Sequence, residues 1–427
     1  MARILFTCFG SLGDLFPYLA VAKVLQARGH DVAVGSTSLY APQIEAESIP
    51  FIHLRSGLDR YTSQESVRQF LERLFDPVQG GKAIAREMMV RIGETYLDTW
   101  EAASNVDVVV ANPLAYATPI VCRERGLPWL STVLAPMFFL STFDPPTMTA
   151  APWLSRLHRL SPALYRAMFG LLKRATLGWA KPLYQLCRDH QLPPPDGHPL
   201  FEGQYSPHGT LAMFPSGFAA PQPDWPPNTR VTGFPYFSSD ADQDAVMRQV
   251  EAFLAVGSAP IVFALGSSAV NIAGDFFVVS ARIARKLGQR AMLVYGQHAD
   301  QIRDIPAGDD ILAVPYASYD RLFDRASVIV HQGGIGTLAQ AMRAKRPMLV
   351  VPFGFDQPDN GQRIERLGLG RTLPRSQYGV DGALPLISEL LNQEGYRQRA
   401  DTLGRDMAME DGVVRAADYI EGFALAK

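Results

Sequence analysis

Short apolar runs alternate with longer amphipathic segments along the whole chain, and this alternation predicts βα units that form parallel sheets. The pattern occurs twice. We expect strands in the first half at residues 4–8, 32–34 and 106–111, and in the second half at 261–265, 292–295, 311–314, 328–330 and 348–351. A helix after the first strand is expected to start at Pro17 and to end at Gly29, because proline suits a first helical turn and glycine a helix end.

A proline-rich segment, residues 215–235, lies between the two halves and includes Pro221, Pro223, Pro226 and Pro227. Proline lacks a backbone N–H, so this segment is expected to be extended, as in a crossing between domains. We therefore expect an α/β protein with two Rossmann-like domains, residues 1–232 and 233–427, and with the last helix free to pack back on the first domain.

Residues 137–188 break the βα rhythm and are expected to form helices interrupted by Pro162 and Pro182. One helical face is apolar, formed by Leu157, Leu160, Leu164, Met168, Leu171, Leu172, Ala175 and Trp179. Seven Lys and Arg residues lie in the same segment, and no acidic residue occurs between Asp144 and Asp189. Two interpretations are open, a solvated basic face whose apolar side covers the first domain's core, and contact with an anionic membrane.

Composition narrows the class of protein. Of 427 residues, 47% are hydrophobic and 19% charged, and 40 Lys and Arg nearly balance 42 Asp and Glu, which excludes a disordered chain and disfavours nucleic acid as a partner. The cysteines are too far apart to suggest a disulfide framework or a structural zinc site. With no signal peptide and no apolar run long enough to cross a bilayer, we expect a cytoplasmic protein, with peripheral contact at the inner membrane face as the alternative.

A glycine-rich turn is the strongest chemical signal. It runs from His331 through Gly333, Gly334 and Gly336 to Thr337, between an expected strand and an expected helix. Glycines allow close approach of a ligand to the backbone, and the free N–H groups of a helix N-terminus favour an anion such as a diphosphate. The alternative is a plain tight turn with His331 as a packed side chain.

Asp14 stands in a second loop, directly after the first strand. Ligands bind at the carboxyl ends of parallel strands, so this carboxylate is placed to take a proton from an attacking hydroxyl. Capping of the following helix is the competing role.

Two further loops carry polar groups at expected strand ends. Asp356 and Gln357 follow the last strand, and a neighbouring carboxylate and amide can bind sugar hydroxyls. Ser267 follows the strand at 261–265 and can add a hydroxyl to a phosphate site. Capping again explains Asp356 equally well.

Together these segments resemble the family 1 nucleotide-sugar glycosyltransferases of the GT-B fold, over nearly the whole chain. The resemblance rests on His331-Gln-Gly-Gly-Ile-Gly-Thr337, followed by Val351-Pro-Phe-Gly-Phe-Asp356-Gln357 and by Asn360. Residues 214–219, 224–225 and 231–235, with Tyr316-Ala317, are similar to the bacterial rhamnosyltransferases that make rhamnolipids.

The resemblance implies two Rossmann-like domains facing each other across a cleft, the first binding the acceptor and the second the donor. Asp14 corresponds to the catalytic base. The residues implied in donor binding are Ser267, His331, Gly333, Gly334, Gly336 and Thr337 for the diphosphate, Tyr316 and Ala317 for the base, and Asp356, Gln357 and Asn360 for the sugar and its loop. Tyr316 stands where plant relatives have a tryptophan, which leaves a uracil and a thymine base both open.

We therefore expect an inverting, metal-independent glycosyltransferase that uses a UDP- or dTDP-sugar as co-substrate and needs no other cofactor. An epimerase or hydrolase of the same fold and a non-catalytic nucleotide-sugar sensor are the alternatives. The acceptor is expected to be apolar, such as a hydroxy fatty acid or other lipid, polyketide, sterol or flavonoid, because aromatic residues cluster in the first domain. Residues expected to contact it are Ser11, Phe138, Phe139, Phe143 and Phe169, with ordinary core packing as the alternative.

Overall fold

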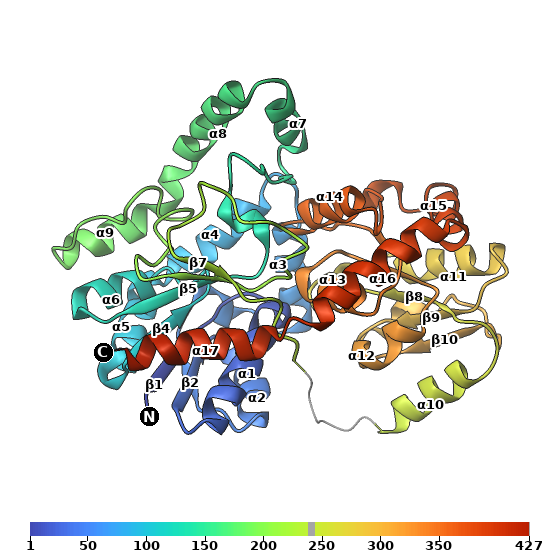
Figure 1. Ribbon diagram of the computed structural model, residues 1–427, viewed down its shortest axis with the longest axis horizontal. Helices are drawn as coiled ribbons and strands as arrows, with labels where there is room; N and C mark the ends of the chain where they lie inside the picture. Colours follow the sequence, from blue (N-terminus) through green and yellow to red (C-terminus); the bar gives the residue numbers. More distant parts are fainter. Residues whose placement is uncertain (238–243, 427) are drawn as a thin grey trace. The chain divides into compact units, whose positions relative to one another are not determined.

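The computed structural model describes residues 1–237 and 244–426, and the chain forms two compact units (Figure 1). Unit 1 comprises Met1–Ser239 and Glu410–Lys427, and unit 2 comprises Asp240–Met409. The boundary thus lies a few residues after the expected one at 232/233, and residues 410–427 belong to unit 1, in line with the expectation that the last helix can pack back on the first domain. In each unit helices lie on both faces of one parallel sheet.

Unit 1 contains a seven-stranded sheet in the order β3-β2-β1-β4-β5-β6-β7, all parallel. Its strands are β1 (Arg3–Thr7), β2 (Asp31–Ser36), β3 (Phe51–His53), β4 (Val108–Ala111), β5 (Trp129–Val133), β6 (Thr210–Ala212) and β7 (Thr229–Val231). Its α-helices are α1 (Leu12–Ala27), α2 (Ala41–Ala46), α3 (Gln64–Leu74), α4 (Gly80–Val90), α5 (Ile92–Ala102), α6 (Thr118–Arg125), α7 (Pro152–Leu160), α8 (Pro162–Thr176), α9 (Lys181–Asp189) and α17 (Gly412–Leu425), and its 3-10 turns are η1 (Ser38–Tyr40), η2 (Gly57–Arg60), η3 (Ala103–Asn105), η4 (Pro136–Phe139) and η5 (Leu177–Ala180). The strand order reverses direction between β1 and β4, so ligand-binding loops are expected after these two strands.

Unit 2 contains a six-stranded parallel sheet in the order β10-β9-β8-β11-β12-β13. Its strands are β8 (Ile261–Ala264), β9 (Ala291–Val294), β10 (Ile311–Val314), β11 (Val328–His331), β12 (Met348–Val350) and β13 (Gly370–Thr372). Its helices are α10 (Asp244–Ala255), α11 (Phe276–Lys286), α12 (Tyr319–Leu322), α13 (Ile335–Arg343), α14 (Gln357–Leu367), α15 (Val380–Asn392) and α16 (Glu394–Ala408), with 3-10 turns η6 (Ala269–Ile272), η7 (Ala299–Ile302), η8 (Phe323–Arg325) and η9 (Arg375–Gln377). Here the order reverses between β8 and β11.

The last helix, α17, packs on α1 within unit 1. Arg28, which follows α1, forms ion pairs with Asp418 and Glu421 at 2.7 Å each, and His30 Nε2 lies 3.0 Å from Glu421. These contacts hold the C-terminal segment against the first strand and helix of the chain.

The start of α1 differs from the sequence prediction. The helix begins at Leu12 rather than at Pro17, because Ser11 and Asp14 form a capping box that satisfies the free N–H groups of the first turn. Pro17 lies inside the helix, and the chain leaves the helix through Gly29, which has a φ of +87°. The proline-rich segment 215–235 is non-helical as expected, but it contains turns rather than one extended run. It also contains β7 and belongs to the sheet of unit 1 rather than to a crossing.

Helices α7 and α8 form a hairpin that extends away from the sheet of unit 1 (Figure 1). Pro162 and Pro182 each stand in a first turn, so they start α8 and α9. The interpretation in which the apolar side of this segment covers the first domain's core does not fit Leu160, Leu164 and Leu171, which are 85%, 47% and 62% exposed. The hairpin is held instead by a small core of its own, which consists of Leu154, Tyr165 and Phe169 packed against Leu140, Met148, Ala151, Leu157 and Met168.

Candidate active site

The loop between β1 and α1 fixes the Asp14 carboxylate at the point where the strand order of unit 1 reverses. Asp14 Oδ2 accepts hydrogen bonds from the Ser11 N–H at 2.7 Å and from the Ser11 hydroxyl at 2.9 Å. Gly10 has a φ of +131°, and a Cβ at this position would lie 2.4 Å from Asp14 Oδ2. The Tyr40 hydroxyl donates to the Gly10 carbonyl at 2.7 Å. Glycine at position 10 is therefore required for the carboxylate to take this position.

The second oxygen of Asp14 is free in the described part of the chain, since both hydrogen bonds to this carboxylate end on Oδ2. Burial raises the pKa of Asp14, and the two hydrogen bonds from Ser11 oppose this effect. A carboxylate with one hydrogen-bonded oxygen, one oxygen without a hydrogen bond and a raised pKa can act both as a helix cap and as a proton acceptor. Capping and base chemistry thus use different oxygens of the same side chain.

In unit 2, the loops after β8 and β11 touch each other where the strand order reverses. A Cβ on Gly266 would lie 2.3 Å from Gln332 Nε2, so only glycine allows this approach. Gln332 Nε2 also lies 3.4 Å from the Thr337 hydroxyl, and Gln332 Oε1 is buried without a hydrogen-bond partner among the described residues. Gln332 was not among the predicted site residues. Its proximity to the loop after β8 follows from the strand order, which local patterns do not reveal.

The N-terminus of α13 is open. Gly334 is its N-cap and, having no side chain, forms no capping hydrogen bond. Gly334 and Gly336 are partly exposed, whereas Thr337 is buried. Uncapped N–H groups of the first turn together with the helix dipole form a ready site for an anionic group.

His331 is placed differently from the expectation that it donates to a ligand. Its ring is fully buried, its Nδ1 accepts from the Gly333 N–H at 3.0 Å, and its Nε2 lies 3.4 Å from the Met348 sulfur. Burial lowers the pKa of His331 to about 3, so the ring is neutral at physiological pH. Both ring nitrogens face the protein, and His331 therefore shapes the glycine turn instead of presenting charge to a ligand.

The loop before α14 is tied to this turn through Asn360. Asn360 Nδ2 donates to the Gly333 carbonyl at 2.9 Å and to Asp356 Oδ2 at 2.7 Å, and the residue is fully buried. We expected Asn360 to contact the donor, but in this position it connects two loops. The amide oxygen of Gln357 is also hydrogen-bonded within the protein: Oε1 accepts from the N–H groups of Phe353 and Gly354 at 2.7 and 3.2 Å. The Asp356 carboxylate lies in the same loop and accepts the hydrogen bond from Asn360, next to the amide nitrogen of Gln357.

Two further predicted donor residues lie on neighbouring loops of the same edge. Ser267 and Tyr316 are exposed, Tyr316 to 48%, while Ala317 is buried. The Tyr319 hydroxyl donates to the Leu265 carbonyl at 3.5 Å, which connects the loops after β10 and β8. Unit 2 thus gathers an exposed aromatic ring, an open helix N-terminus and a polar loop at one edge of its sheet.

Comparison with known protein families agrees with the division of the chain into two units. Residues 4–143 match the glycosyltransferase family 28 N-terminal domain, and residues 290–416 match the erythromycin biosynthesis protein CIII-like C-terminal domain. The chain is 29% identical to O-mycaminosyltylonolide 6-deoxyallosyltransferase of Streptomyces fradiae over 99% of this chain and 97% of that protein. The chain is a glycosyltransferase of the GT-B type.

Other proteins resemble this chain either over part of their own, longer sequence or in fold. A sterol 3-beta-glucosyltransferase of Arabidopsis thaliana is 26% identical over 97% of this glycosyltransferase, which spans 64% of that relative. Among solved structures, the calicheamicin glycosyltransferase CalG4 has a TM-score of 0.69 at 18% identity, covering 100% of this chain and 99% of that chain. The spinosyn rhamnosyltransferase SpnG complexed with thymidine diphosphate has a TM-score of 0.65 at 19% identity, covering 98% and 100%. These structures support the expected GT-B fold.

The aromatic residues expected to bind the acceptor do not form one cavity in the glycosyltransferase. Phe139 is buried in a core cluster with Phe214 and Trp225, and Phe138 packs against this cluster. Phe169 is buried in the separate core of the α7–α8 hairpin, and Phe143 is 55% exposed. Core packing therefore explains Phe139 and Phe169, and Ser11 caps α1. The sequence could not separate these roles, because an aromatic residue in a core and one in a pocket have the same local pattern.

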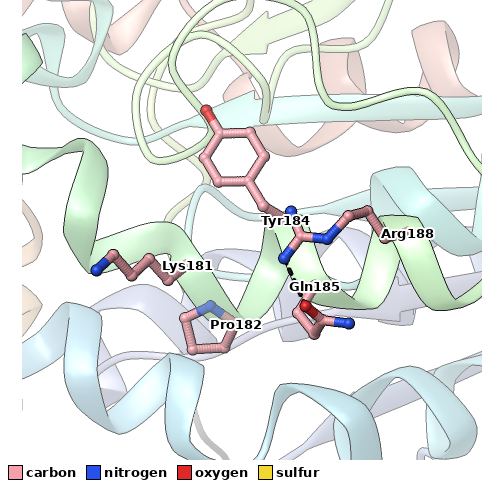
Figure 2. Close-up of a pocket in the computed structure, with 5 residues that line it drawn as sticks. All are labelled: Lys181, Pro182, Tyr184, Gln185 and Arg188. Carbon is pink, nitrogen blue, oxygen red and sulfur yellow. Dashed lines mark hydrogen bonds between the residues drawn. The ribbon is translucent and has the colours of Figure 1, made fainter.

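A cavity of about 580 Å³ opens on α9 (Figure 2). It is lined by Lys181, Pro182, Tyr184, Gln185 and Arg188, all from this one helix, and Arg188 donates to Gln185 Oε1 at 2.5 Å. None of the predicted site residues lines it. The loops at the sheet edges therefore remain the candidate site.

No group of three or more His, Cys, Asp or Glu side chains is close enough to hold a metal ion within residues 1–237 and 244–426. In the same part of the chain, no helix has the length and hydropathy needed to cross a bilayer.

Proposed function

We propose that this glycosyltransferase moves a sugar from a UDP- or dTDP-linked donor to a hydroxyl of an apolar acceptor, with inversion and without a metal ion. The observation that carries the proposal is that Asp14 Oδ2 is held by two hydrogen bonds from Ser11, while Oδ1 accepts none from the described residues. In the proposed step Asp14 Oδ1 takes the proton of the acceptor hydroxyl, whose oxygen attacks the anomeric carbon. The bond to the nucleoside diphosphate breaks, and the diphosphate leaves with the electron pair.

Donor binding is assigned to the loops of unit 2. The open N-terminus of α13 and the Thr337 hydroxyl would bind the diphosphate, and the charge that develops on it would be stabilised by N–H groups already in place. The Ser267 hydroxyl is exposed on the adjacent loop. Asp356 and the Gln357 amide nitrogen would hold sugar hydroxyls, and Tyr316 would lie against the base. His331 and Asn360 would hold these loops in place.

The choice of co-substrates is supported by the relatives. The SpnG structure contains thymidine diphosphate, which favours a dTDP-sugar, and its rhamnosyl donor is one candidate. The named relatives act on a sterol and on O-mycaminosyltylonolide, which favours an apolar hydroxylated acceptor. Turnover that persists in the presence of a chelator is expected if helix N–H groups supply the stabilisation that magnesium supplies elsewhere.

The decisive experiment is Asp14→Asn, assayed for transfer and for nucleotide binding by calorimetry. The amide keeps the size of the side chain but takes up no proton, so turnover should fall about 100-fold or more while donor affinity stays unchanged. Asp59→Asn is the matched control, because Asp59 forms the same kind of capping box with Ser56 in unit 1. Near wild-type turnover in Asp14→Asn would leave Asp14 with its capping role alone. Release of free sugar without acceptor would indicate a hydrolase instead.

A further inference from the structure

The outer face of the α7–α8 hairpin carries apolar side chains that the fold does not use. Trp153 and Leu160 on α7 are 53% and 85% exposed, and Leu164 and Leu171 on α8 are 47% and 62% exposed. The hairpin already has its own core around Tyr165 and Phe169, so these four side chains are not needed to hold its helices together. Large exposed apolar groups gathered on one element mark an interaction surface.

The exposed side of the hairpin is also positively charged. Arg156, Arg159, Arg166 and Arg174 are exposed, and none of them forms an ion pair with an acidic residue in the described part of the chain. Neither helix contains an acidic residue. Lys173, by contrast, is paired with Glu202, so its charge is offset while those of the four exposed arginines are not.

Helical geometry places charge and apolar groups side by side. In a helix of 3.6 residues per turn, Leu164 and Leu171 are seven residues apart and lie in one row. Arg174 lies about 60° from Leu171 on the exposed side of α8, opposite the buried Tyr165, whereas Arg166 lies on the other flank of the exposed side, about 160° from Leu164. Trp153, Arg156 and Leu160 are spaced by three and four residues and repeat the arrangement on α7. Arginine beside tryptophan and leucine on one exposed face is typical of helices that lie in the interface of an anionic bilayer.

From this arrangement we propose that the hairpin docks on an anionic lipid surface, with its leucines and Trp153 entering the acyl boundary and its arginines contacting the headgroups. Charge complementarity favours lipid over a second copy of the chain, since a symmetric contact would bring unpaired arginines together. The exposed leucines favour lipid over a polyanion without apolar groups.

Flotation with vesicles of phosphatidylcholine, alone or mixed with phosphatidylglycerol, tests the docking surface on the full chain. The wild type should float with anionic vesicles at low salt and less at high salt. Arg166→Gln/Arg174→Gln should weaken this binding about 30-fold, since each cation near an anionic surface contributes roughly a fivefold factor. Leu164→Ser/Leu171→Ser should weaken it at high salt as well.

Matched controls separate this surface from general charge and hydrophobicity. Lys82→Gln/Arg86→Gln removes two exposed cations from α4, and Val90→Ser/Leu97→Ser removes two exposed apolar side chains from α4 and α5. Both controls should bind like the wild type. Equal flotation with both vesicle types, no flotation, equal losses in the controls, or a dimer in light scattering that Leu164→Ser/Leu171→Ser dissolves would overturn the proposal. No donor or acceptor is present, so this result is independent of the proposed reaction.

Discussion

Replacing Asn360 by alanine should separate the two loops that form the donor edge of unit 2. The change removes the hydrogen bonds from Asn360 Nδ2 to the Gly333 carbonyl and to the Asp356 carboxylate. A neutral hydrogen bond contributes about 0.5–1.5 kcal/mol and one to a charged group about 1.5–3 kcal/mol, so the free energy of unfolding should fall by about 2–4 kcal/mol. Calorimetric unfolding of the full chain should show this loss in the transition of unit 2, which is identified as the transition that shifts to higher temperature when nucleotide is added.

The effect on ligands distinguishes positioning from direct contact. If Asn360 holds the glycine turn in place, Asn360→Ala should weaken binding of UDP or dTDP alone by the same factor as binding of the nucleotide sugar, about tenfold for a loss of roughly 1.4 kcal/mol in loop order. Asn392→Ala is the control, because Asn392 is an exposed asparagine of the same unit that bonds only within α15. A variant that loses affinity for the nucleotide sugar but not for the bare nucleotide would show that Asn360 contacts the sugar, and the positioning argument would be wrong.

Three further outcomes follow from the geometry. Gly333→Ala should destabilise the fold by about 2–4 kcal/mol in urea unfolding, since φ is +88° and the new Cβ would lie 2.5 Å from Val350 Cγ1; adding Val350→Ala should recover part of that loss. Because burial raises the pKa of Asp14, kcat/KM should rise with pH through a pKa above that of an ordinary aspartate, as a pH–rate profile would show. His30 lowers the pKa of Glu421, so this carboxylate stabilises the fold at neutral pH and less as pH falls through its lowered pKa; Glu421→Gln should lower Tm at neutral pH, and the difference should vanish in acid.

The buried central strands were predictable from the sequence. Strands covered by helices on both faces appear as continuous apolar runs, and the expected strands for β8, β11 and β12 differ from the observed ones by one residue at an end. The edge strand β10, which is only partly buried, also coincides with the expected strand at 311–314. Strands β3, β6, β7 and β13, of three residues each, and five-residue β5 were missed. Three-residue β12 was predicted because it lies in the longer apolar run 348–351. The start of α1 was predicted wrongly, because the capping box formed by Ser11 and Asp14 begins the helix at Leu12, before Pro17.

The positions of the site loops were predictable, but their neighbours were not. Asp14 and the glycine turn follow strands whose ends the apolar pattern shows directly. The contact of Gly266 with Gln332 depends on β8 lying beside β11 although β9 and β10 come between them in the chain. Sheet order is a long-range property, and no local spacing encodes it.

Burial decides which polar residues of the motif can touch a ligand, and burial is a property of the folded structure. His331 and Asn360 have the residue types and spacing of ligand-binding groups, yet both are fully buried and hydrogen-bond to Gly333 from two sides, at its N–H and at its carbonyl. With φ at +88°, Gly333 adopts a conformation that ordinary residues rarely reach, so the turn needs partners that hold it there. The two polar side chains supply these partners, and the N–H groups at the start of α13 stay open because no side chain caps them. In the proposed function this motif would present a rigid set of backbone N–H groups to the diphosphate: the glycines set its shape, the buried polar residues fix it, and the exposed groups around it would select the donor.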